Sequence, residues 1–147
     1  MQPSYKHYLK IIRNTCTGHE RPVTIPSEEL ADLARLAEEH CTVPFVLSSF
    51  RGTPFYSSML QRTRSMMLNY YQIDQFTRHT VSLLEDNGID CILLKGISLA
   101  SCYPVPEYRK LGDLDLYISR KSDVSKAQKL LESHGYVAEN ELSDHHL

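Results

Sequence analysis

The sequence predicts an α/β (α+β) fold in which a mainly helical N-terminal half precedes a small mixed sheet with flanking helices. Three patterns carry this prediction. Apolar residues recur at helical spacing over residues 27–40, and residues 56–86 contain neither glycine nor proline. Residues 113–119 instead alternate apolar with polar side chains, as half-buried strands do. We therefore divide the chain into a helical region, 1–87, and an α/β core, 88–147, which either stand apart or form one compact domain.

The helical region opens with an apolar stripe at roughly helical spacing over residues 1–14, and a loop with glycine and proline follows over residues 15–26. Ser27 begins the next helix, which we expect to reach about His40. Serine is a favoured N-cap residue, and the two glutamates that follow it lie at the positive end of the helix dipole.

A short segment and a long helix complete this region. The period of residues 43–50 fits both a helix and a strand, although Pro44 suits the first turn of a helix. Residues 56–86 predict one long helix, which ends at Asn87-Gly88. The aromatic and methionine residues along it are more typical of a packing face than of a ligand pocket.

The C-terminal half predicts strands and helices in alternation. The expected elements are a strand at Ile89–Leu94, a short helix at Ser98–Tyr103, a strand at Asp113–Ser119, a helix from Ser122 that ends at Gly135, and a third strand beginning at Tyr136–Ala138.

Composition narrows the class of protein. The chain has 147 residues, of which 41% are hydrophobic and 23% charged, values close to those of ordinary globular domains. A net charge of -2 provides no basic field, so nucleic acid is not favoured as a partner. The sequence shows no membrane span and no secretory signal, and its four scattered cysteines argue against a zinc site or a disulfide framework. We therefore expect a cytoplasmic protein with reduced thiols.

Two aspartates in the second predicted strand are the main candidates for chemistry. Asp113 and Asp115 share one face of that strand, with their Cβ atoms about 7 Å apart. An apolar strand that ends in Lys95-Gly96 precedes them, and a glycine turn beside paired carboxylates suits a divalent metal with phosphates. On its own an Asp-x-Asp motif is more often a solvated strand face.

The wider motif resembles a known family. The segments LLKGISLASCYP and GDLDLYI, with Arg109 between them, are similar to nucleotidyltransferases of the DNA polymerase β-like superfamily. The most similar subgroup is a bacterial family with an L-L-K-G…L-A…Y-P…R…G-D-x-D signature. The flanking segments PSEELADLARLAEEHCTVPFVLSSF and KAQKLLESHGY also resemble that family, so the likeness covers most of the chain.

This resemblance implies a reaction, a cofactor and a substrate. The reaction is metal-dependent transfer of a nucleoside monophosphate from a nucleoside triphosphate (NTP) to an unknown acceptor. Two divalent ions stabilise the attacking and leaving oxygens in such transfers, which implies Mg²⁺ or Mn²⁺ as the cofactor. The resemblance assigns Asp113 and Asp115 as the catalytic, metal-binding carboxylates.

The same resemblance makes the turn at Gly96 the element that cradles phosphates, because glycine allows backbone amides to approach them closely. Lys95 either pairs with the triphosphate or forms a salt bridge with an acid. Ser98 either donates its hydroxyl to the nucleotide or serves as an N-cap. The superfamily usually places serine or glycine directly after the glycine, whereas Ile97 intervenes here.

Arg109 is the remaining candidate for nucleotide binding. It either contacts phosphates or braces the aspartates, and we weight bracing slightly higher because the guanidinium fork suits bidentate pairing with carboxylates.

One departure from the family pattern concerns a third carboxylate. Superfamily members usually carry it on a later strand, but no acid after Asp115 lies in a convincing apolar strand. In the family the chain would continue past Asp144-His145-His146 into such a strand, so we expect a truncated chain that binds metal and nucleotide poorly and turns over nothing. We interpret the adjacent histidines as a solvated tail, because two ligands are too few for zinc. An unpaired sheet edge would favour a homodimer.

Two functions from other classes stay open at this point. The first is a non-catalytic, nucleotide-binding or regulatory protein that keeps the fold. The second is an interaction module, such as half of a toxin–antitoxin pair, in which the helical half binds the partner.

Overall fold

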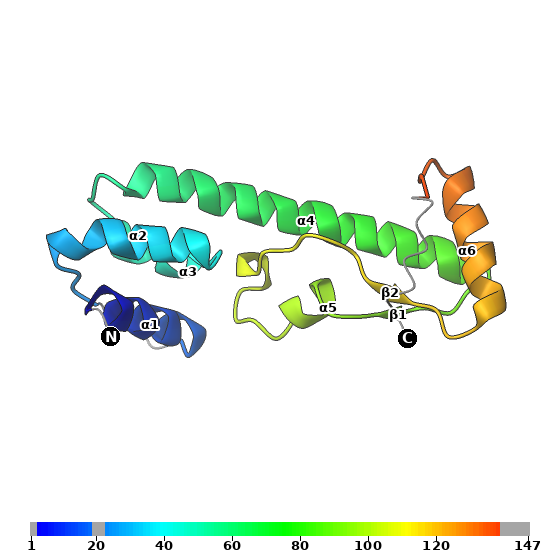
Figure 1. Ribbon diagram of the computed structural model, residues 1–147, viewed down its shortest axis with the longest axis horizontal. Helices are drawn as coiled ribbons and strands as arrows, with labels where there is room; N and C mark the ends of the chain where they lie inside the picture. The colour runs from blue at the N-terminus through cyan, green and yellow to red at the C-terminus, as the bar shows by residue number, and fades with distance from the viewer. Residues whose placement is uncertain (1–2, 19–22, 139–147) are drawn as a thin grey trace.

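The computed structural model describes residues 3–18 and 23–138 (Figure 1). It has a mixed α+β fold with a helical N-terminal part and a small two-stranded sheet, which confirms the predicted fold class. The elements are α1 (Pro3–Cys16), the 3₁₀ helix η1 (Ser27–Glu29), α2 (Leu30–Glu39), α3 (Val43–Val46), the 3₁₀ helix η2 (Leu47–Phe50), α4 (Tyr56–Asp86), β1 (Ile92–Leu93), α5 (Ile97–Ala100), the 3₁₀ helix η3 (Pro106–Tyr108), β2 (Leu116–Tyr117) and α6 (Lys121–Ser133).

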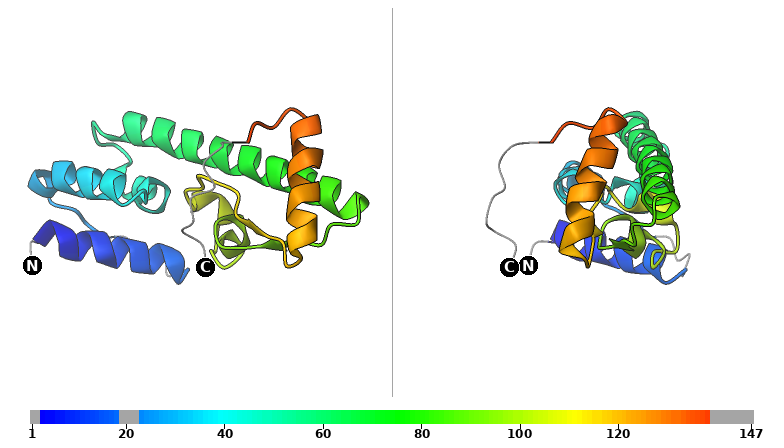
Figure 2. Two further views of the ribbon diagram at one scale, coloured as in Figure 1. Left: turned by 45° about the vertical axis from the view of Figure 1, so that its right-hand side comes forward. Right: turned by 90° about the vertical axis from the view of Figure 1, so that its right-hand side faces the viewer.

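The molecule is elongated, and α4 runs along most of its length (Figure 1). Helices α2 and α3 lie along the first part of α4, with α1 on their far side, whereas β1, β2 and α5 lie beside its second part. Helix α6 crosses the far end of α4 steeply, as both views in Figure 2 show. Within the N-terminal part, α3 packs against α1, α2 and α4, while η3 packs against α4 further along.

The N-terminal helices enclose one apolar cluster. Its largest fully buried side chains are those of Leu33, Val46, Phe50 and Met59, each at most 1% exposed. Polar contacts tie α1 to this cluster, since the Tyr8 hydroxyl lies 2.8 Å from Thr42 Oγ1. The helix predicted for residues 27–40 is present, with its first turn as η1, and the ambiguous segment 43–50 is helical throughout.

A second, smaller cluster holds the sheet against the end of α4 and against α6. Leu84, Ile89 and Ala127 are its buried residues, and Leu116 and Ile118 pack against it. Strands β1 and β2 are antiparallel, with Ile92 opposite Tyr117 and Leu93 opposite Leu116. One face of the sheet therefore belongs to the core, and the other face is open.

The structure corrects several predicted boundaries in this part. The strands expected at Ile89–Leu94 and Asp113–Ser119 shrink to two residues each, because pairing begins after Cys91 and stops at the Lys95-Gly96 turn. The helix expected at Ser98–Tyr103 is the single turn α5. Residues 136–138 form no strand.

Tyr136 explains why that third strand does not form. Its ring packs against Phe76, and its hydroxyl lies 3.1 Å from Thr80 Oγ1, so α4 holds this segment in place of the sheet. None of the helices in the described ranges is both long and apolar enough to cross a membrane.

Candidate functional site

The strand that leads into the glycine turn and the segment that carries Asp113 and Asp115 lie side by side. The antiparallel pairing continues beyond β1 and β2, because the Leu94 amide donates to the Asp115 carbonyl at 3.0 Å. One step further, a Cβ atom on Gly96 would lie 3.5 Å from the Asp113 carbonyl oxygen. The glycine turn therefore lies directly against the start of the aspartate segment.

Both aspartates lie on the open face of the sheet. Leu116 packs into the core, so by the alternation of a strand Asp115 and Tyr117 face the other way, as does Asp113. The exposure of Tyr117, at 51%, and of Asp113 agrees with this. The shared face predicted for Asp113 and Asp115 is thus the face away from α4.

Asp115 carries an unusual oxygen. Its side chain is half-buried, and Oδ2 is shielded from solvent without a hydrogen-bond partner among the described residues. The Lys95 ammonium lies 3.2 Å from this oxygen, so the two groups form an ion pair whose alignment falls short of a hydrogen bond. The Asp113 carboxylate is exposed and makes no ion pair with the residues that the structure describes. Of the two roles open for Lys95, the structure shows the salt bridge.

The turn at Gly96 requires a glycine. Gly96 has φ +55° and ψ −115°, and the Ser98 amide donates to the Lys95 carbonyl at 3.1 Å. These values are those of a type II′ turn with glycine at its first central position. The following helix, α5, is only four residues long, so its dipole adds little affinity for phosphate.

Ser98 is not the N-cap of α5, because Gly96 occupies that position. The Ser98 hydroxyl instead points at backbone carbonyls, 2.9 Å from Lys95 O and 3.1 Å from Leu94 O. The hydroxyl proton of Ser98 is therefore used in hydrogen bonds within the turn, while the hydroxyl oxygen can still accept a hydrogen bond.

Arg109 contacts the glycine turn and neither aspartate. Its Nε donates to the Gly96 carbonyl at 3.1 Å, and its Nη1 donates to the Tyr103 hydroxyl at 3.1 Å. The guanidinium also lies over the Tyr103 ring, 5.6 Å from the centroid. The expectation that Arg109 braces the aspartates is therefore wrong, since the fork is directed at the backbone of the turn.

Tyr103 is a residue that the sequence analysis missed. It lies within the Tyr-Pro pair of the motif, which was the available signal. Its ring and that of Tyr108 contact Phe45 of α3, with centroid separations of 6.1 and 5.3 Å. The N-terminal helices therefore reach the loop that carries Arg109.

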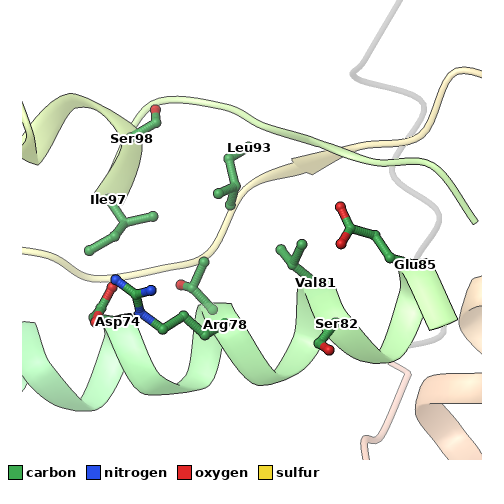
Figure 3. A pocket seen from close by; sticks show the side chains of 9 residues that line it. Asp74, Arg78, Val81, Ser82, Glu85, Leu93, Ile97 and Ser98 are labelled. Atoms are coloured by element: carbon green, nitrogen blue, oxygen red, sulfur yellow. Dashed lines mark hydrogen bonds and ion pairs between the residues drawn. The ribbon is translucent and has the colours of Figure 1, made fainter.

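A cavity of about 360 Å³ lies between α4 and the strand–turn segment (Figure 3). Its lining residues are Asp74, Thr77, Arg78, Val81, Ser82, Glu85, Leu93, Ile97 and Ser98. Leu93 pairs with Leu116 and so lies on the core face of the sheet. The cavity is therefore on the opposite face from the two aspartates and is not the place where they would hold a metal.

Within residues 3–18 and 23–138, no three histidine, cysteine or acidic side chains come close enough together to hold a metal ion. Asp113 and Asp115 are thus a pair without a third protein ligand in the described part of the chain. The predicted tail at His145 and His146 lies outside the described residues.

Comparison with known proteins identifies the family. A family described as an uncharacterised nucleotidyltransferase matches residues 26–147, a range that contains the glycine turn, Arg109 and both aspartates. Comparisons with curated proteins and with solved structures found no match. Since the family covers most of the chain, the protein belongs to this family of uncharacterised nucleotidyltransferases.

Proposed function

We propose that this protein binds an NTP together with a divalent cation and transfers the nucleoside monophosphate to an acceptor. The family supports the class of reaction. The metal, the nucleotide and the residues that bind them are part of the proposal.

The observation that carries the proposal is the buried Oδ2 of Asp115, which has no hydrogen-bond partner among the described residues. A buried carboxylate oxygen without a hydrogen bond carries a desolvation cost of about 1–3 kcal/mol or more, which the poorly aligned ion pair with Lys95 offsets only in part, so such an atom is expected to gain a further partner in the functional state. An oxygen of this kind, with the exposed Asp113 on the same face, fits a hard cation. Mg²⁺ is commonly bound by one or two carboxylates plus substrate phosphates, so two protein ligands suffice.

Asp113 and Asp115 would hold Mg²⁺ or Mn²⁺, which would supply charge stabilisation to the reacting phosphate. The glycine turn would direct backbone amides at the phosphates, as its place against the start of the aspartate segment suggests. Lys95 is 65% exposed at its side chain, so its ammonium is free to turn from Asp115 to a phosphate.

Isothermal titration of ATP, GTP, CTP and UTP, each with and without Mg²⁺, tests this function. We expect binding that requires Mg²⁺ and is lost in the double variant Asp113→Asn/Asp115→Asn. Asp32→Asn is the matched control, because Asp32 is an exposed acid on α2 and should leave binding unchanged.

Binding that is independent of Mg²⁺, or that survives in the double variant, would contradict the assignment of the aspartates. Absence of binding for all four nucleotides would overturn the proposed function. Pyrophosphate release on incubation with candidate acceptors then separates a transferase from a protein that only binds nucleotide.

A further inference from the structure

We infer that Arg109 is a positioning residue: it fixes the orientation of the glycine turn through the Gly96 carbonyl, and Tyr103 and the N-terminal helices set the orientation of Arg109. The effect of this positioning on phosphate binding rests on the proposed function, whereas the contact between Arg109 and the turn does not.

The first step concerns the peptide group that Arg109 holds. In the turn from Lys95 to Ser98 the central peptide joins Gly96 to Ile97, and this is the peptide whose orientation distinguishes the turn types. Arg109 Nε donates to the carbonyl of that peptide at 3.1 Å. Because a trans peptide is planar, fixing the Gly96 carbonyl directs the Ile97 N–H to the opposite side. The arginine therefore determines where an amide of the proposed phosphate cradle points.

The second step concerns what holds the guanidinium. Nη1 donates to the Tyr103 hydroxyl, and the guanidinium lies over the same ring. A planar fork with two acceptors and a ring contact has little rotational freedom. The backbone is fixed as well, because Arg109 caps the C-terminal end of η3 and its amide donates to the Pro106 carbonyl at 3.1 Å.

The third step connects this group to the N-terminal helices. Phe45 of α3 is 5% exposed, and its ring contacts both Tyr103 and Tyr108. Tyr108 directly precedes Arg109 in the chain. The helical half thus supports the arginine at its side chain, through Tyr103, and at its backbone, through Tyr108.

The positive charge of Arg109 is also available to attract a bound anion. It forms no ion pair with the residues that the structure describes, and its two side-chain hydrogen bonds go to neutral acceptors. A guanidinium has five N–H donors, so the fork keeps donors beyond those two. Because the positive charge of the Arg109 guanidinium is not neutralised by any described residue, it would favour a phosphate bound at the turn.

Amide hydrogen exchange at Ser98 tests the contact without any nucleotide. The Ser98 amide closes the turn, so its exchange reports whether the turn stays formed. We expect Arg109→Gln to speed this exchange about tenfold, the value of roughly 1.4 kcal/mol lost from one charged hydrogen bond. Tyr103→Phe should have a smaller effect in the same direction, because it keeps the ring and removes only the hydroxyl.

Two matched variants serve as controls. Arg35→Gln removes an exposed arginine that pairs with Glu39, and Tyr136→Phe removes the hydroxyl that contacts Thr80. Both should leave Ser98 exchange unchanged. Unaltered Ser98 exchange in Arg109→Gln would overturn the inference.

Titration with Mg²⁺–tripolyphosphate, which has no base or sugar, tests the link to phosphate binding. We expect about tenfold weaker binding in Arg109→Gln and little recovery in Arg109→Lys, because an ammonium carries the charge but not the fork. Added methylguanidinium should partly restore binding in Arg109→Ala. Full recovery in Arg109→Lys would overturn the positioning role in favour of a simple charge effect.

The two proposals fail separately. If the unaltered protein binds neither the four nucleotides nor Mg²⁺–tripolyphosphate, the proposed function is contradicted, while Ser98 exchange still decides whether Arg109 positions the turn. If tripolyphosphate binds but Arg109→Gln binds it equally well, the positioning role is overturned and the proposed function stands.

Discussion

The Lys95 ammonium lies 3.2 Å from Asp115 Oδ2, the oxygen that has no hydrogen-bond partner among the described residues. A cation already stands beside the atom that we assign to the metal. The amine and a divalent ion would therefore compete for one carboxylate oxygen, and the amine would be released toward the phosphates when the ion binds.

Replacing Lys95 by methionine tests this competition. We expect Lys95→Met to bind Mn²⁺ alone more tightly, by up to about fivefold, since an ion pair made by a largely exposed lysine is worth about 0.2–1 kcal/mol. The same variant should bind Mg²⁺–tripolyphosphate more weakly, because it has lost a phosphate ligand. Electron paramagnetic resonance of free Mn²⁺ measures the first effect, with Lys10→Met as a surface control. Weaker Mn²⁺ binding in Lys95→Met would contradict the competition.

Gly96→Ala should destabilise the turn for conformational reasons. The added Cβ has ordinary van der Waals space, 3.5 Å from the Asp113 carbonyl, but the backbone at φ +55° and ψ −115° suits glycine alone. We expect a loss of about 1–3 kcal/mol in the free energy of unfolding, measured by urea denaturation. Gly112→Ala is the control, since its Cβ would meet open space and its φ is ordinary. Equal losses in both variants would contradict this account.

Two buried threonines of α4 should respond in opposite ways to valine. Thr63 Oγ1 has no hydrogen-bond partner among the described residues, so Thr63→Val should raise the free energy of unfolding by about 1 kcal/mol. Thr80 Oγ1 lies 3.1 Å from the Tyr136 hydroxyl, so Thr80→Val should lower it by a similar amount. Urea denaturation of the two variants measures the difference. Destabilisation in both would mean that an ordered water satisfies Thr63.

Asp123 should make stability sensitive to acid. A hydrogen bond from Lys126, at 3.1 Å, is the largest cause that lowers the pKa of the buried Asp123 carboxyl, and Arg120 at 2.8 Å adds to it. A lowered pKa stabilises the fold above the ordinary value of 3.8, and the contribution is lost as the pH falls through the lowered value. The gap in unfolding free energy between the unaltered protein and Asp123→Asn should therefore narrow below about pH 4. A gap that stays constant from pH 7 to pH 3 would contradict this prediction.

The long helix was predictable in full, whereas the contacts of the site were not. Residues 56–86 contain no glycine or proline and Asn87-Gly88 follows them, so the sequence alone predicts the extent of α4. The third strand predicted at Tyr136–Ala138 was wrong because a short apolar segment does not reveal its tertiary partner, and here Phe76 of α4 packs against Tyr136. Arg109 was misplaced for a similar reason, since carboxylate and backbone carbonyl are both good acceptors and only tertiary packing selects between them.

Helix α4 also fixes the rotational orientation of the second part of the molecule relative to the first. Its buried residues form one stripe, with Met59 and Thr63 in the first part and Thr77, Thr80 and Leu84 in the second. The fourteen-residue step from Thr63 to Thr77 is two heptads, which keeps both parts of the stripe on nearly the same side. One residue inserted between them would rotate the second part by about 100° and displace the glycine turn relative to Phe45, whose ring contacts Tyr103. The candidate site therefore depends on the number of residues in the middle of α4 as well as on the aspartates.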